Sequence, residues 1–201
     1  AADSRLDLAA IFPGFECFKL EIGFGNGESL LQMAAEDPGC AYIGIEVHEP
    51  GVGHCLKLLH AAGLDNLKLI SHDASEVLES MIPPQVLDAV LLFFPDPWHK
   101  KRHHKRRIVN QHFRDLLFAA MKPGAVLHMA TDWVPYAEHM EEVADASPWF
   151  DPLDDAGAGD TGSGRPGTKF ERRGLRHGHR IWDWRFVRSD DEPDGLATRE
   201  L

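Results

Sequence analysis

Short apolar runs alternate with amphipathic segments along most of this chain, and this alternation constrains the fold more than any other feature. Residues 90–94 are all apolar, as in a strand buried on both faces of a parallel sheet. Residues 108–121 instead have the apolar spacing of a helix, which Lys122-Pro-Gly would end. Strands that alternate with helices imply right-handed crossovers and helices on both faces of the sheet.

The same reading assigns the remaining elements. The predicted strands are 17–22, 41–47, 66–70, 87–94, 125–131, 168–172 and 180–187, and the predicted helices are 28–35, a segment ending near 62, 75–81, 108–121 and 134–147. We therefore predict an α/β, doubly wound, Rossmann-like fold with a mostly parallel seven-stranded sheet and an antiparallel last strand. Ligands of such sheets bind beyond the carboxyl ends of the strands, where the strand order reverses.

The length of 201 residues suits one well-buried domain and is short for two. We predict a single domain over 1–201. Within it, 1–14 would be a lead-in, the glycine-rich 151–167 a mobile loop, and 189–201 an acidic tail.

Three cysteines, Cys17, Cys40 and Cys55, have no paired spacing, so we expect neither a disulfide framework nor a structural zinc site. No apolar run approaches the roughly 20 residues of a membrane span, and no basic-then-apolar leader precedes Ala1. These features favour a cytoplasmic protein with no membrane partner.

The net charge of -11 is unevenly distributed. Segment 99–107 holds six Lys or Arg and no acid, and segment 165–180 holds six with one acid. Together they carry +11, which leaves -22 on the rest of the chain. Two cationic segments in an acidic protein indicate contact with phosphate groups, whereas a single charge run is usually a solvated face.

A glycine-rich turn follows the first predicted strand, with Gly23, Gly25 and Gly27 spaced as G-x-G-x-G. A dinucleotide-binding turn has the spacing G-x-G-x-x-G, which aims a helix N-terminus at a diphosphate. The acidic Glu21 before the turn is a poor neighbour for a diphosphate but a good one for a sulfonium or an amino group. The pattern therefore favours S-adenosylmethionine over NAD.

Acidic residues also end the next two predicted strands. Glu46 lies about twenty residues after the glycines, where a carboxylate can accept hydrogen bonds from both ribose hydroxyls. Asp73 follows the third strand, where an acceptor can meet the adenine amino group. Each acid alone could be a helix cap. Their occurrence at successive strand ends predicts a methyltransferase-type cofactor site.

The fourth strand runs into a stiff turn in which Asp96 stands between Pro95 and Pro97. The two prolines restrict the backbone and remove two amide donors, so the turn presents the Asp96 side chain on a rigid platform. Trp98 and the first cationic segment follow at once. This combination indicates a functional site more than a connecting loop.

The sequence of 93–107, FFPDPWHKKRHHKRR, closely resembles the tRNA (guanine-N7-)-methyltransferase family. The resemblance extends through the motifs EIGFGNG at 21–27, GIEVH at 44–48, HDA at 72–74, ATDW at 130–133 and TKFERRG at 168–174. It implies a class I methyltransferase fold with S-adenosylmethionine as methyl donor. It also implies methylation of N7 of a variable-loop guanine, tRNA position 46, with no partner subunit, as a monomer or homodimer.

The resemblance also implies roles for individual residues. Glu21, Glu46, Asp73 and Asp96 would line the cofactor site, and Asp96 would be catalytic. The implied substrate contacts are Lys100, Asp132, Thr168, Lys169, Phe170 and Glu171, and the implied RNA contacts are Arg102, His103, His104, Lys105, Arg106 and Arg107.

Guanine N7 carries a lone pair and no proton, so the reaction needs positioning and no general base. Ionised carboxylates only accept hydrogen bonds and so match the N1–H and N2–H₂ donors of guanine. We therefore interpret Asp96, Asp132 and Glu171 as residues that hold and orient the base. Trp98 or Trp133 could stack on it or could pack in the core.

His99, His103 and His104 could suggest a metal site, but no Cys or carboxylate set completes a ligand shell. Among so many cations they would supplement phosphate contacts, and His128 within a strand would be structural. We expect no metal. Two other functions remain open: a non-catalytic RNA-binding module of the same fold, and a small-molecule methyltransferase.

Overall fold

The computed structural model describes residues 5–146, 148–153 and 165–190, and most of the predicted mobile loop and acidic tail lies outside these ranges. The strands are β1 Cys17–Ile22, β2 Cys40–Ile45, β3 Leu67–Ile70, β4 Leu87–Phe93, β5 Met121–Thr131, β6 Phe150–Pro152 and β7 Trp182–Arg188. The helices are α1 Leu8–Ile11, α2 Glu28–Glu36, α3 Glu49–Ala62, α4 Ala74–Ser80, the 3₁₀ helix η1 Lys101–Arg106, α5 Gln111–Ala120, α6 Val134–Asp145 and α7 Lys169–Arg176.

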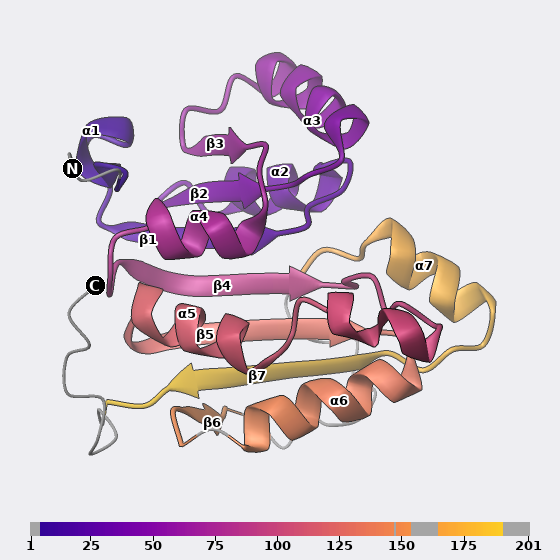
Figure 1. Ribbon diagram of the computed structural model, residues 1–201. Coiled ribbons are helices and arrows are strands. Elements are labelled where there is room, and N and C mark those ends of the chain that lie inside the picture. Colours follow the sequence, from indigo (N-terminus) through magenta and orange to yellow (C-terminus); the bar gives the residue numbers. More distant parts are fainter. Residues whose placement is uncertain (1–4, 147, 154–164, 191–201) are drawn as a thin grey trace.

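The strands form one sheet in the order β3-β2-β1-β4-β5-β7-β6 (Figure 1). Strands β1 to β5 pair in parallel, and β7 is antiparallel to both β5 and β6. This arrangement confirms the predicted doubly wound sheet with an antiparallel last strand. The strand order reverses between β1 and β4, so a ligand cleft is expected at the carboxyl ends of these two strands.

Helices cover both faces of the sheet. One face packs against α1, α4, α5 and α6, with Phe12, Val77, Phe113 and Tyr136 among the fully buried side chains. The other face packs against α2 and α3 through Leu30 and Cys55. The residues of β4 are almost all buried, because β4 is the central strand of the sheet and helices cover both of its faces.

The prediction of a strand over 168–172 was wrong, because these residues begin helix α7. Thr168 accepts from the Glu171 amide at 3.0 Å, and the Glu171 carboxylate accepts from the Thr168 amide at 3.2 Å. This reciprocal capping box satisfies the first free amides of a helix and fixes its start. The seventh strand comes instead from the short β6, which pairs with β7.

The expectation of unpaired cysteines was also wrong, because Cys17 and Cys40 form a disulfide. The two residues start the neighbouring strands β1 and β2 and lie opposite each other in register, with their Cα atoms 4.7 Å apart. Their separation of 23 residues in sequence gave no sign of this pairing. The disulfide lies at the amino ends of the strands. None of the described helices combines the length and the apolar character that crossing a membrane requires.

Candidate active site

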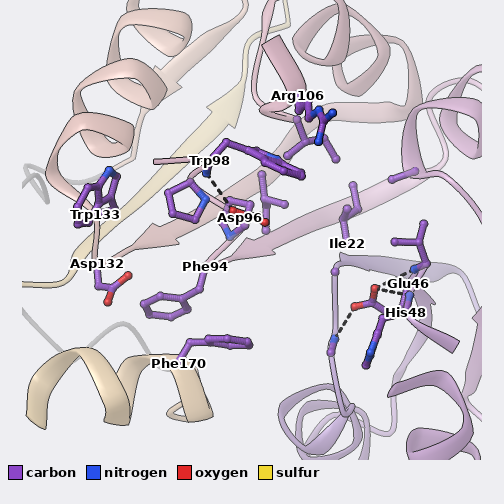
Figure 2. Close-up of a pocket in the computed structure, with 18 of the residues that line it drawn as sticks. Ile22, Glu46, His48, Phe94, Asp96, Trp98, Arg106, Asp132, Trp133 and Phe170 are labelled. Carbon is purple, nitrogen blue, oxygen red and sulfur yellow. Dashed lines mark hydrogen bonds between the residues drawn. The ribbon is translucent and has the colours of Figure 1, made fainter. Parts of the chain in front are cut away.

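A pocket of about 700 Å³ opens at the carboxyl ends of the central strands. Residues that follow β1, β2 and β3 line one side, and residues that follow β4 and β5 line the other together with α7. Figure 2 shows Ile22 and Glu46 on one side, Asp132, Trp133 and Phe170 on the other, and Asp96 between them. The pocket therefore lies at the predicted reversal of strand order.

The glycine turn after β1 forms part of the pocket wall. Gly23 and Gly25 line the pocket, with φ values of 75° and 59° that favour glycine. A Cβ atom on Gly51, in the first turn of α3, would lie 2.3 Å from the Gly25 carbonyl oxygen. The missing side chain thus lets α3 approach the turn closely. Gly27 does not line the pocket and instead packs against Cys55, whose Sγ would lie 2.2 Å from a Cβ at position 27.

Glu46 and Asp73, the two acids predicted to contact the cofactor, both line the pocket. The Glu46 carboxylate accepts from the Gly25 amide at 2.8 Å and from the amides of Val47 and His48 at 2.8 and 2.9 Å. Asp73 uses Oδ1 to accept from the first amides of α4. A carboxylate has about four acceptor positions, so each group is held by the backbone and still has capacity for a ligand.

Glu21 lies behind the pocket and not in its lining. Its side chain is on the face of β1 that packs against α2 and α3, and the residue is 3% exposed. Burial raises the pKa of Glu21 from an ordinary 4.5 to about 8, against the opposing effect of the Arg165 guanidinium. Its Oε2 atom has no hydrogen-bond partner among the described residues.

The turn that carries Asp96 is held in an unusual backbone conformation. Phe94 and Trp98 have φ values of 52° and 47°, which cost non-glycine residues on the order of 1 to 3 kcal/mol each. Asp96 Oδ1 accepts from the Trp98 amide at 2.9 Å, and Asp96, Phe94 and Trp98 all line the pocket. Such strain concentrates at functional sites, where it fixes one geometry.

The first cationic segment folds as η1 beside this turn. Arg102, Lys105 and Arg106 are exposed, and the Arg106 guanidinium lies over the Trp98 ring, 4.9 Å from its centroid. His103 packs edge-on against the same ring. Lys100 is exposed outside the pocket lining.

Arg107 does not join this cationic surface, because it is only 5% exposed. It donates to the carbonyls of Pro97 and Pro135 and lies over the Tyr136 ring. Its guanidinium also contacts His104, and partial burial together with this charge lowers the pKa of His104. Arg107 therefore ties the turn to α6, and RNA cannot reach it in this conformation.

Helix α7 brings only one of its four predicted substrate residues into the pocket. Phe170 lines the pocket, whereas Lys169 is exposed outside it. Thr168 and Glu171 are occupied by the capping box, and Glu171 is buried. The predicted contact of Glu171 with guanine would require its carboxylate to leave the Thr168 amide.

The sequence analysis did not single out Arg165, because only the fold brings Glu171, Asp183 and the end of β4 around its side chain. Its side chain is 3% exposed and donates to the Glu171 carboxylate at 2.8 and 3.1 Å and to Asp183 at 2.8 Å. It also lies over the rings of Phe93 and Phe94. Arg165 thus fastens the start of α7 to β7 and to the end of β4.

His128 completes this buried group by bonding Asp183 at 2.5 Å. Burial raises the pKa of Asp183, but hydrogen bonds and charges from His128 and Arg165 outweigh it and hold the pKa below its usual value. The structural role expected for His128 agrees with this buried position outside the pocket lining.

Asp132, one of the predicted substrate residues, follows β5 and lines the pocket. Its Oδ2 atom lies 3.1 Å from His179 Nδ1. Arg173, His177 and His179 line the same wall, and the sequence analysis did not select them. Trp133 lies beside Asp132 with the His99 ring edge-on, their centroids 4.3 Å apart. Within the described ranges, no three His, Cys, Asp or Glu residues converge as a metal site would need.

Comparisons with known proteins agree with this geometry. The family model described as "Putative methyltransferase" matches residues 16–184. A tRNA (guanine-N(7)-)-methyltransferase from Yersinia pseudotuberculosis is 52% identical over 186 residues, covering 92% of this chain and 78% of the relative. One from Idiomarina loihiensis is 51% identical over 187 residues, covering 92% and 76%.

A solved structure with the same fold is a 16S rRNA (adenine(1408)-N(1))-methyltransferase from Catenulisporales acidiphilia, crystallised with the cosubstrate SAM. Its TM-score is 0.63 at 20% identity, over 96% of this chain and 97% of that one. At this identity the likeness supports the class I methyltransferase fold alone. The sequence matches above are far stronger and cover nearly all of the chain, and by them the chain belongs to the tRNA (guanine-N7-)-methyltransferase family.

Proposed function

We propose that this protein transfers the methyl group of S-adenosylmethionine to N7 of a guanine in the variable loop of tRNA. One observation carries the proposal: a single pocket gathers Glu46, Asp73, Asp96 and Asp132 from the ends of four strands. The names of the relatives supply the substrate class.

The first half of the pocket fits S-adenosylmethionine. At Gly23 and Gly25 the absence of side chains lets the ligand approach the backbone closely. The side chains of Ile22, Ile45 and Val47 supply apolar surface for its purine ring. Glu46 and Asp73 would accept from the ribose hydroxyls and the adenine amino group. When bound, the donor supplies a positively charged sulfonium whose methyl group is open to attack.

The second half of the pocket fits a purine ring. The side chains of Phe94 and Phe170 face each other in Figure 2, with Asp132 beside Phe94. Carboxylates at Asp96 and Asp132 would accept from the N1–H and N2–H₂ donors of guanine and turn N7 toward the methyl group. Because N7 has a free lone pair, these residues orient the base and do not remove a proton.

Cations surround this half of the pocket. Arg102, Lys105 and Arg106 on η1 are exposed, and so are Arg172 and the following arginines of α7. They would contact phosphates on either side of the flipped or looped-out guanine and account for a salt-dependent affinity. We place the reaction in the cytoplasm, where tRNA is modified, without a partner subunit.

The test is methylation of an unmodified tRNA transcript with methyl-labelled S-adenosylmethionine, followed by nucleoside mapping. We expect 7-methylguanosine in the variable loop and no labelling when 7-deazaguanosine replaces the target. Asp96→Ala should lose turnover and keep its fold, and the exposed Asp65→Asn serves as control. Absence of label with the fold and cofactor affinity intact, or label on the 7-deaza substrate, would reject the proposal.

A further inference from the structure

Helix α7 approaches the Asp132 side chain unusually closely. A Cβ atom built on Gly174 would lie 2.7 Å from Asp132 Oδ2 and 3.1 Å from its Cβ. Only a residue without a side chain leaves space for the carboxylate here. Gly174 therefore lets the backbone of α7 rest against Asp132 at the pocket wall.

The end of α7 turns back toward the same carboxylate. Gly178 has a φ of 74°, and its amide donates to the Leu175 carbonyl at 3.0 Å. The His179 amide donates to the Gly174 carbonyl at 3.0 Å. These two bonds around a left-handed glycine form a Schellman motif, which closes a helix in one conformation. The motif therefore holds His179 beside Gly174, the residue in contact with Asp132.

The His179 side chain meets Asp132 through a specific atom. His179 Nδ1 lies 3.1 Å from Asp132 Oδ2, and since a carboxylate only accepts, Nδ1 must carry the hydrogen. Asp132 Oδ1 has no hydrogen bond to any residue within the described ranges. Both side chains are partly exposed, at 42% and 29%, so a ligand in the pocket can reach this pair.

We propose that His179 is the positioning residue for Asp132: it fixes Oδ2 so that Oδ1 faces the target guanine. The inference rests on the proposed function. Because His179 holds one oxygen of the Asp132 carboxylate, the carboxylate has lost its rotational freedom before the guanine binds. Binding of the guanine then costs less side-chain entropy. The motif that ends α7 thereby sets the geometry of base recognition, although His179 itself need not touch the base.

The test is a double-mutant cycle on methylation of tRNA, with His179→Ala, Asp132→Asn and the double variant. We expect His179→Ala to lower kcat/KM for tRNA about tenfold, as for loss of one charge-assisted hydrogen bond. The Kd of S-adenosylmethionine, measured by calorimetry, should change less than about twofold. In the Asp132→Asn background, His179→Ala should lower kcat/KM by a further factor of less than about two, because the partner of His179 is already altered.

Two further variants separate positioning from general damage. His179→Asn can place an amide N–H near the site of Nδ1 and should recover most of kcat/KM. His112→Ala, on the exposed side of α5, should leave every measured constant unchanged. Fully additive costs in the cycle, a wild-type kcat/KM for His179→Ala, or an Asn variant as poor as the Ala variant would each overturn the inference. A wild-type protein that leaves tRNA unmethylated would reject the proposed function, and the inference with it.

Discussion

The buried carboxyl of Glu21 makes the stability of this protein depend on pH in a way that one substitution should remove. Glu21 is 3% exposed, and burial raises its pKa from 4.5 to about 8 although Arg165 acts in the opposite direction. In the unfolded chain the same group returns to its ordinary value. Folding therefore changes the proton affinity of this one side chain by more than three powers of ten.

The sign of the effect follows from proton binding in the two states. Below pH 4.5 the group is neutral whether the chain is folded or unfolded, and its full contribution to stability is present. Between 4.5 and about 8 the folded chain keeps a proton that the unfolded chain releases. The free energy of unfolding then falls by about 1.4 kcal/mol per pH unit, and the total loss is on the order of 5 kcal/mol. Above about pH 8 the loss is complete.

Glu21→Gln keeps the shape of the side chain and has no proton to release. Urea unfolding of wild type and variant at about pH 6 and about pH 8 should show the variant gaining roughly 2 kcal/mol on the wild type between these conditions. The exposed Glu79→Gln on α4 is the matched control and should track the wild type. A constant difference between wild type and Glu21→Gln would mean that Glu21 is already ionised in the folded protein, and the reasoning would be refuted.

Three further predictions concern neighbouring features. Arg165→Met leaves the buried carboxylates of Glu171 and Asp183 without their guanidinium and should lower the free energy of urea unfolding by about 3 to 5 kcal/mol. The exposed Arg172→Met should change it by less than about 0.5 kcal/mol. Equal losses in the two variants would contradict the buried ion network. Gly27→Ala should lower the free energy of unfolding by more than about 1 kcal/mol, because a Cβ at position 27 would lie 2.2 Å from the buried sulfur of Cys55 on α3. Gly39→Ala, where a Cβ meets open space, should not lower it. A tolerated Gly27→Ala would show that α3 can shift. Arg106→Ala should reduce the slope of log Kd for tRNA against log salt by roughly 0.7 to 0.9, and an unchanged slope would remove its phosphate contact.

The sequence predicted the sheet well because its signals are local. Apolar strands such as β4 and the glycine turn after β1 each carry their own pattern, and the alternation of elements limits the topology. The acids that follow the strands could be placed at one edge for the same reason. Glu46, Asp73, Asp96 and Asp132 all reach the pocket.

Two predictions failed, one at a local signal that was overlooked and one at a contact between distant segments. Thr168 and Phe170 favour a strand by composition, but the reciprocal bonds of Thr168 and Glu171 decide for a helix. Cys17 and Cys40 pair only because β1 and β2 lie in register. The T-x-x-E spacing was readable in the sequence, whereas the register was not.

The acids that line the pocket differ in how they are held. Glu46, Asp73 and Asp96 accept from backbone amides one to three residues further along the chain, besides the Gly25 amide that Glu46 also binds. Asp132 is instead held by His179, 47 residues away. The cofactor half can therefore form with the central strands, whereas the substrate half is complete only when α7 has docked. Changes in α7 should accordingly weaken recognition of tRNA and spare binding of S-adenosylmethionine, which is the separation that the His179 variants measure.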